Sequence, residues 1–170
     1  MSYPQYPNQQ QQQQQQATSY QPGGEPPLWA PYYGATLPIA AKRFFKKYAT
    51  FSGRASRSEY WWWALIGFAV SVVLNIIMQV GGAAGATVAA NGSTVPGPGF
   101  LVGSIIAFVW GLAVLVPSLA LLVRRLHDVN ISGWLVLIIL VPFLGALALV
   151  VIAILPSNPA GQRFDQPTGH

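Results

Sequence analysis

Three long apolar runs constrain this chain more than any other feature. They cover residues 60–80, 100–123 and 134–155, and none of them contains a charged residue. Each has at least about 20 residues, which at ~1.5 Å per residue is enough to cross a hydrocarbon core of ~30 Å as a helix. The runs therefore predict an all-α integral membrane protein with three transmembrane helices. The third run contains Pro142 and Gly145 near its middle, so a re-entrant shape is the alternative for that run.

The composition agrees with a membrane location. Only 8% of the residues are charged, whereas an average soluble domain carries roughly 25%. The net charge of +5 suggests an anionic partner, and the basic residues flank the apolar runs, which favours lipid headgroups over nucleic acid. The chain has no cysteine, so disulfides and thiolate chemistry are excluded.

Two segments precede the first run. Residues 1–35 are rich in Gln, Tyr and Pro and cannot bury enough apolar surface to offset the entropy of ordering, so they are predicted to be a disordered tail or a docking tail. In residues 36–55, apolar residues recur at helical spacing from Leu37 to Phe51, which predicts a basic amphipathic helix in the headgroup layer, followed by a linker. The opposite face of this helix carries Lys42, Arg43, Lys46 and Lys47.

The distribution of basic residues predicts the orientation in the membrane. Eight basic residues precede the first run or follow the second, whereas the loop 81–99 has no charge and only Arg163 follows the third run. By the positive-inside rule the N-terminus is cytoplasmic. The membrane domain then covers residues 56–155, and residues 156–170 form a short C-terminal tail.

The start of the first span has its own signals. Ser56 and Glu59 have the S-x-x-E spacing of a capping box, which predicts that the helix begins near Arg57. Aromatic side chains at such positions lie at headgroup depth and anchor a span. The predicted anchors are Tyr60, Trp61, Trp62, Trp63 and, at the start of the third run, Trp134.

A second polar cluster, RRLHDVNISGW, follows the second span and lies on the same predicted face as the first cluster. We expect a cytoplasmic charged network in which Glu59 pairs with Arg124 or Arg125, and Asp128 pairs with Arg54 or Arg57. Desolvated Arg–carboxylate pairs are stronger than surface pairs, so the network would hold the first two spans together. Its predicted members are Arg54, Arg57, Glu59, Arg124, Arg125, His127 and Asp128.

His127 stands next to a carboxylate, which raises the question of catalysis. An imidazole in that position can act as a general base, sense pH, or make a structural hydrogen bond. No Ser or Cys nucleophile stands in a recognisable setting, and the other histidine is the terminal His170, so we expect no catalytic residue, metal or cofactor. The structural interpretation is the preferred one.

Stripes of small and polar residues run through the first two spans at four-residue spacing. Such stripes let helices approach and form hydrogen bonds between them, either within this chain or with another copy. The alternative is that the polar members line a path through the membrane. The stripe residues are Gly67, Ser71, Asn75 and Gln79 in the first span and Gly103, Ala107 and Gly111 in the second.

Several of these patterns together resemble a known family. The sequence FSGRASRSEYW (51–61), then RRLHD (124–128), then SGW (132–134), is similar to a family of small bacterial inner-membrane proteins catalogued as domain of unknown function 805. The likeness covers about residues 42–167, although Gln162 and Asp165 depart from the family's closing segment. The resemblance implies a multi-pass protein of the bacterial plasma membrane and adds no mechanism, because the family has no agreed activity.

These observations favour a non-catalytic interaction or structural component of the cell envelope, with another copy or a second membrane protein as its partner. The alternative is a subunit of a small oligomeric transporter or channel, with a charged cytoplasmic mouth. Three spans per chain would require oligomers to enclose a path.

Overall fold

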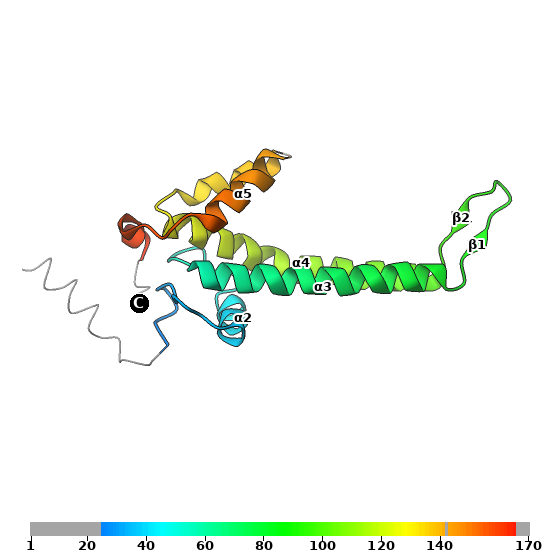
Figure 1. The fold of residues 1–170 in the computed structure, drawn as a ribbon, viewed down its shortest axis with the longest axis horizontal. Helices are drawn as coiled ribbons and strands as arrows, with labels where there is room; N and C mark the ends of the chain where they lie inside the picture. The colour runs from blue at the N-terminus through cyan, green and yellow to red at the C-terminus, as the bar shows by residue number, and fades with distance from the viewer. Residues whose placement is uncertain (1–24, 142, 166–170) are drawn as a thin grey trace, which may run out of the picture.

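The computed structural model describes residues 25–141 and 143–165, which fold mostly into helices (Figure 1). Most of the predicted disordered tail lies outside the described residues, and so does Pro142. In chain order the elements are α2 (Leu37–Lys46), α3 (Arg57–Ala83), β1 (Thr87–Val88), β2 (Thr94–Val95), α4 (Pro98–Asp128), the 3-10 helix η1 (Gly133–Leu140), α5 (Leu144–Ile154) and the 3-10 helix η2 (Pro159–Phe164).

Within the described residues, two helices are long and apolar enough to cross a membrane, and these are α3 and α4. They lie side by side along the long axis of the molecule (Figure 1). Only 6% of the most apolar window of α3 and 22% of that of α4 is buried inside the protein. The core helices of a soluble protein would be mostly buried, so these bare apolar surfaces fit a lipid environment.

Both spanning helices begin with recognisable sequence signals. The Ser56 hydroxyl accepts a hydrogen bond from the Glu59 N–H, and the Glu59 carboxylate accepts one from the Ser56 N–H, so the capping box forms and α3 begins at Arg57. The other helix, α4, has Pro98 in its first turn, where a missing N–H costs nothing. After α4 ends, Asn130 adopts a left-handed conformation with φ 63°, and the chain turns back there.

At the far end of the pair, α3 and α4 make a close backbone contact between glycines. A Cβ added to Gly99 would lie 2.5 Å from the Cα of Gly81, so neither position has room for a side chain. Beyond this contact, β1 and β2 form an antiparallel hairpin with Thr87 paired to Val95 (Figure 1). The close packing of the two helices therefore depends on glycines next to the uncharged loop, which the stripe analysis did not include.

The third apolar run does not form the continuous helix predicted for residues 134–155. It is divided into η1 and α5, which pack against each other as a hairpin (Figure 1). Phe143, just before α5, has φ 63°, and a Cβ on Gly145 would lie 2.7 Å from the carbonyl oxygen of Ile138. The prediction of one continuous helix is wrong because hydropathy does not distinguish a single long helix from two shorter apolar segments joined by a turn.

Both ends of this hairpin lie at the C-terminal end of α4. The chain enters it directly after Ile131, whose N–H donates to the carbonyl of Leu126. The chain leaves it at Leu155, whose carbonyl accepts a hydrogen bond from the Arg125 guanidinium. The residues after the third run therefore lie at the same end of the molecule as the residues before it.

The amphipathic helix predicted within residues 36–55 forms as α2, but it is shorter, and only part of its basic face is exposed. It packs on α3 through Phe44, whose ring stacks on Trp63. This contact turns Arg43 and Lys47 into the protein, where both are buried. The prediction placed these two cations toward the headgroups, so it is wrong for them.

Candidate functional site at the charged end

The charged end of the molecule is the end at which α3 begins and α4 ends. The segments 25–36 and 155–165 both fold over it (Figure 1). Its buried ionisable side chains are Arg43, Lys47, Arg54, Arg124, Arg125, Glu59 and Asp128, and the partly buried Asp165 lies beside them.

Asp128 is one of two carboxylates around which the charged end is organised, and its side chain is 0% exposed. Its oxygens accept hydrogen bonds from Arg125, from the Tyr33 hydroxyl at 3.1 Å and from the Ser157 hydroxyl at 2.6 Å. The Arg54 guanidinium lies 3.8 Å away, one of the two pairings expected from the sequence. Asp128 thus joins α4 to both ends of the described chain.

The proton on Tyr33 is held firmly. Burial and the negative charge of Asp128 raise the pKa of the Tyr33 phenol above its usual value of 10.0. The hydroxyl therefore stays protonated at neutral pH and acts as the donor to the carboxylate.

Glu59 is the second carboxylate, and its partners differ from those predicted. Arg43 Nε donates to it at 2.6 Å, the N–H groups of Ser56 and Tyr32 donate at 3.0 and 3.2 Å, and Lys47 Nζ lies 3.9 Å away. The expected pairs with Arg124 or Arg125 are not among the ion pairs of the described residues. The prediction is wrong because Arg43 of α2, and neither arginine of α4, occupies the position next to the Glu59 carboxylate.

The arginines of α4 have other partners. Arg125 pairs with Asp128, three residues further along the same helix, and also donates to the carbonyl of Leu155. Arg124 Nε donates to the carbonyl of Ala120 at 3.1 Å. Their positive charges at a helix C-terminus also interact favourably with the helix dipole.

Arg54 and Arg57 have different surroundings, although they are only three residues apart in the sequence. Arg54 makes a side-on contact with Asp165, with Nε 2.9 Å from both carboxylate oxygens. Arg57 is exposed and lies 3.5 Å from the carbonyl of Ile154, so the alternative pairing of Arg57 with Asp128 does not form. The Asp165 contact was missed because the sequence analysis placed the C-terminal tail on the opposite side of the membrane.

His127 holds the C-terminal segment in place. Its Nδ1 is 3.1 Å from the carbonyl of Gly53, and its ring stacks on Phe164 with centroids 4.1 Å apart and planes at 6°. A Cβ on Gly161 would lie 2.4 Å from the His127 carbonyl oxygen, so the segment fits only with glycine there. These contacts suit the structural interpretation of this histidine.

The predicted aromatic anchors divide between protein and surface. Trp62 Nε1 donates to the carbonyl of Ala35 at 2.8 Å, and Trp63 is buried with its Nε1 3.4 Å from the Ser118 hydroxyl. Trp61 and Trp134 are exposed, as interfacial anchors would be, and Tyr60 is half-buried. Trp63 is therefore a core residue, because α2 covers the side of α3 on which it lies.

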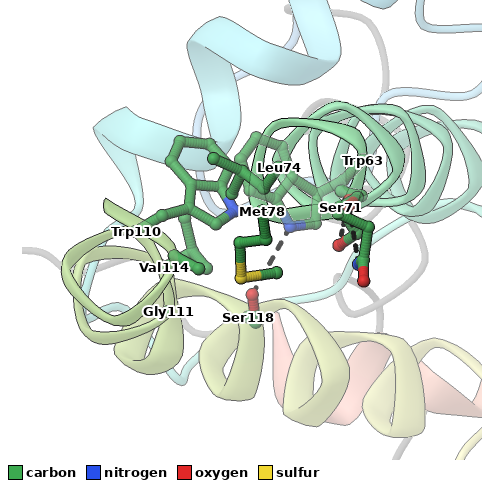
Figure 2. A pocket seen from close by; sticks show the side chains of 11 residues that line it. Trp63, Ser71, Leu74, Met78, Trp110, Gly111, Val114 and Ser118 are labelled. Carbon is green, nitrogen blue, oxygen red and sulfur yellow. Dashed lines mark hydrogen bonds between the residues drawn. The ribbon is translucent and has the colours of Figure 1, made fainter. Parts of the chain in front are cut away.

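Part of the small and polar stripes lines a groove of about 360 Å³ between α3 and α4 (Figure 2). A Cβ added at Gly67 or Gly111 would meet nothing within 4 Å, whereas Gly103 lies against Met78. The predicted close packing thus occurs at Gly103, and the helices are apart where the groove opens. The stripe residues that line it are Gly67, Ser71, Asn75, Ala107 and Gly111.

The polar groups of this groove bond mainly within their own helix. The Ser71 hydroxyl donates to the carbonyl of Gly67 at 2.8 Å, and Asn75 Nδ2 donates to the carbonyl of Ser71 at 2.9 Å (Figure 2). Gln79 is exposed and is not among the lining residues. Across residues 25–141 and 143–165, no three His, Cys, Asp or Glu side chains gather as a metal site would require.

The charged end brings together the residues that carried the family resemblance, from Phe51–Trp61 and Arg124–Asp128. The family model described as "Protein of unknown function (DUF805)" matches residues 48–166. This chain belongs to the DUF805 family. The resemblance noted in the sequence is therefore confirmed, and the family is one of inner membrane proteins without an assigned activity.

Two relatives in Escherichia coli strain K12 support this membership. The inner membrane protein YhaI is 34% identical over 119 residues, which cover 70% of this chain and 86% of YhaI. The inner membrane protein YhaH is 32% identical over 122 residues, which cover 72% of this chain and 89% of YhaH. No solved structure matches the chain.

Proposed function

We propose that this DUF805 protein is a non-catalytic interaction or structural component of the inner membrane. The observation that carries this proposal is the mutual pairing at the charged end. Asp128 is 0% exposed, accepts hydrogen bonds from three side chains and lies 3.8 Å from the Arg54 guanidinium, and the ring of its neighbour His127 stacks on Phe164. Groups that act on a substrate must reach it, whereas these groups bind the two ends of the described chain to the helices.

The proposed orientation places the charged end in the cytoplasm. Eight of the nine basic residues lie before α3, at its first position or in the last turns of α4, and the hairpin between β1 and β2 carries no charge. The third run is then re-entrant, because both of its ends lie at the charged end. The exposed side chains of Lys42, Lys46 and Arg57 are placed to contact anionic headgroups.

Cysteine labelling tests this topology against three full spans. The chain has no cysteine, so single replacements of the exposed residues Ser93, Ser132 and Ala160 can each be labelled with a membrane-impermeant maleimide. We expect labelling at 93 in intact cells, and at 132 and 160 only after permeabilisation. Labelling of 160 in intact cells would establish a third crossing and refute the re-entrant hairpin.

Cross-linking in native membranes tests the interaction role. A photoreactive side chain at Gly67 or Gly111 would project into open space in the groove, and one at Phe108, which is 66% exposed, serves as the lipid-facing control. We expect a defined protein adduct, either with a second copy or with another membrane protein, from the groove positions and not from the control. Lipid adducts alone at all three positions would contradict the proposal.

A transporter or channel subunit is the second candidate, and the groove is the observation that favours it. Asn75 and Ser71 place polar atoms at membrane depth beside the space between α3 and α4. Solute flux into proteoliposomes that is abolished by Asn75→Leu, with the protein still folded, would support this role. Binding of a protein partner in the absence of any solute flux would support the interaction role.

A further inference from the structure

The charged end holds more buried positive charge than negative charge. Five cationic side chains are buried there, and the carboxylates that face them are Glu59, Asp128 and Asp165. The excess positive charge lies around Glu59. Its charge is taken up by Arg43 at 2.6 Å, yet Lys47 lies 3.9 Å from it, beyond hydrogen-bond distance.

Three cationic nitrogen atoms in this region have no hydrogen-bond partner among the described residues: Lys47 Nζ, Arg124 Nη2 and Arg125 Nε. The Arg125 guanidinium is paired with Asp128, which leaves Lys47 Nζ and Arg124 Nη2, and these two residues are each only 1% exposed. They come from different elements: Lys47 directly follows α2, and Arg124 lies in the last turns of α4. Buried polar groups are almost always satisfied, and a buried charge without a partner strongly destabilises a fold.

An arginine cannot relieve this cost by losing its proton, but a lysine can. Burial, together with the positive charges of Arg124 and Arg43, lowers the pKa of Lys47 from its usual 10.5 to about 7, although Glu59 and Asp165 act in the opposite direction. The excess positive charge can therefore be reduced in two ways: Lys47 releases its proton, or the site binds an anion.

We propose that Lys47 and Arg124 form a binding site for a phosphate-type anion at the junction of α2, α3 and α4. A guanidinium offers paired N–H donors that match phosphate oxygens, and the lysine ammonium adds a point charge on a flexible stem. The site lies at the end of the spanning helices where lipid headgroups are found. The anion is the phosphate of a lipid with a net negative headgroup, such as phosphatidylglycerol, or a free inorganic phosphate.

The nearby negative charges do not prevent this. Glu59 already accepts hydrogen bonds from Arg43 Nε and from the N–H groups of Ser56 and Tyr32, and Asp165 is held by Arg54. Lys47 directly follows α2, and its ammonium has no hydrogen bond to break, only the ion pair with Glu59 at 3.9 Å, so binding of the anion requires its side chain alone to turn. Binding then holds α2 against α4 through the anion.

The test is the thermal unfolding of the full chain, first delipidated in a non-ionic detergent and then in nanodiscs. The detergent sample receives phosphate or chloride at equal ionic strength, and the nanodiscs contain phosphatidylcholine with or without phosphatidylglycerol. We expect the unfolding midpoint to rise with phosphate, with phosphatidylglycerol, or with both. A rise with phosphate in detergent identifies free phosphate as a sufficient ligand, and a rise with phosphatidylglycerol alone identifies the lipid headgroup.

The variants separate this site from general electrostatics. Lys46→Met removes an exposed charge next in the chain and should respond as the wild type does, whereas Lys47→Met should lose at least about tenfold in apparent affinity. Lys47→Met should fold well without the anion, because methionine keeps the stem and removes a buried ammonium that has no hydrogen-bond partner. Lys47→Arg should keep binding at pH 8.5, where the wild type weakens.

Two results would overturn the proposal. One is a midpoint that phosphate and phosphatidylglycerol raise no more than chloride and phosphatidylcholine do. The other is a Lys47→Met variant that responds like Lys46→Met, since the anion would then bind elsewhere on the basic surface.

Discussion

Pro117 interrupts the hydrogen-bond ladder of α4, and Tyr48 supplies the missing donor from another part of the chain. Proline has no N–H, so the carbonyl of Ala113, four residues earlier, has no partner within the helix. The Tyr48 hydroxyl donates to that oxygen at 2.7 Å. We predict that Tyr48→Phe destabilises the protein, and that Pro117→Ala removes this effect by restoring the helical N–H.

The magnitude follows from the geometry of this one bond. A neutral hydrogen bond contributes about 1 kcal/mol net, and the larger cost of about 3 kcal/mol applies only to a fully desolvated carbonyl. Tyr48 is 41% exposed, so the smaller figure applies to Tyr48→Phe in the wild-type background. In the Pro117→Ala background the cost should be near zero, and the coupling of about 1 kcal/mol exceeds the ~0.3–0.5 kcal/mol scatter of independent sites.

Equilibrium unfolding in mixed micelles, followed by tryptophan fluorescence, measures all four proteins of this cycle. For a chain of this size, about 1 kcal/mol corresponds to a midpoint shift of about 2–4 °C. The cycle subtracts any packing cost of the Pro117→Ala replacement itself. If Tyr48→Phe costs the same in both backgrounds, the hydroxyl does not serve the carbonyl freed by the proline, and the reasoning fails.

Three further predictions concern the charged end. Asp128→Asn should destabilise by about 3–5 kcal/mol in the same unfolding assay, because it leaves buried guanidinium charge unpaired; an unchanged midpoint would remove Asp128 from its organising role. Gly161→Ala should release the C-terminal segment, seen as faster proteolysis after residue 155, while Gly111→Ala, at a glycine where an added Cβ meets nothing within 4 Å, is the control. In phosphate-free detergent, the free energy of unfolding should rise as the pH increases from about 7 to about 10. The reason is that the unfolded chain keeps the Lys47 proton in this range, whereas the folded chain releases it at about pH 7. Lys47→Met should abolish this pH dependence.

Sequence patterns were reliable where one local signal decided the outcome. The capping box of Ser56 and Glu59 set the start of α3, and uninterrupted apolar sequence marked α3 and α4 as the spanning helices. The pairing of Asp128 with Arg54 was also among the predicted options, because both lie next to the ends of those helices. The same sequence did not reveal the glycine contact between α3 and α4, since glycines in a loop region suggest turns before they suggest packing.

The amino-acid sequence by itself determined that this is a helical inner membrane protein of the DUF805 family. The length of the apolar runs and the local motifs can be read without knowing how the chain packs. The tertiary structure decided which way the charges face and where the third run ends. Helical spacing separates Arg43 and Lys47 from Lys42 and Lys46, but only the contact of Phe44 with Trp63 turns the first pair inward. Likewise, the fold of residues 155–165 over His127 and Arg54 depends on distant partners, and no local pattern specifies a partner more than a hundred residues away.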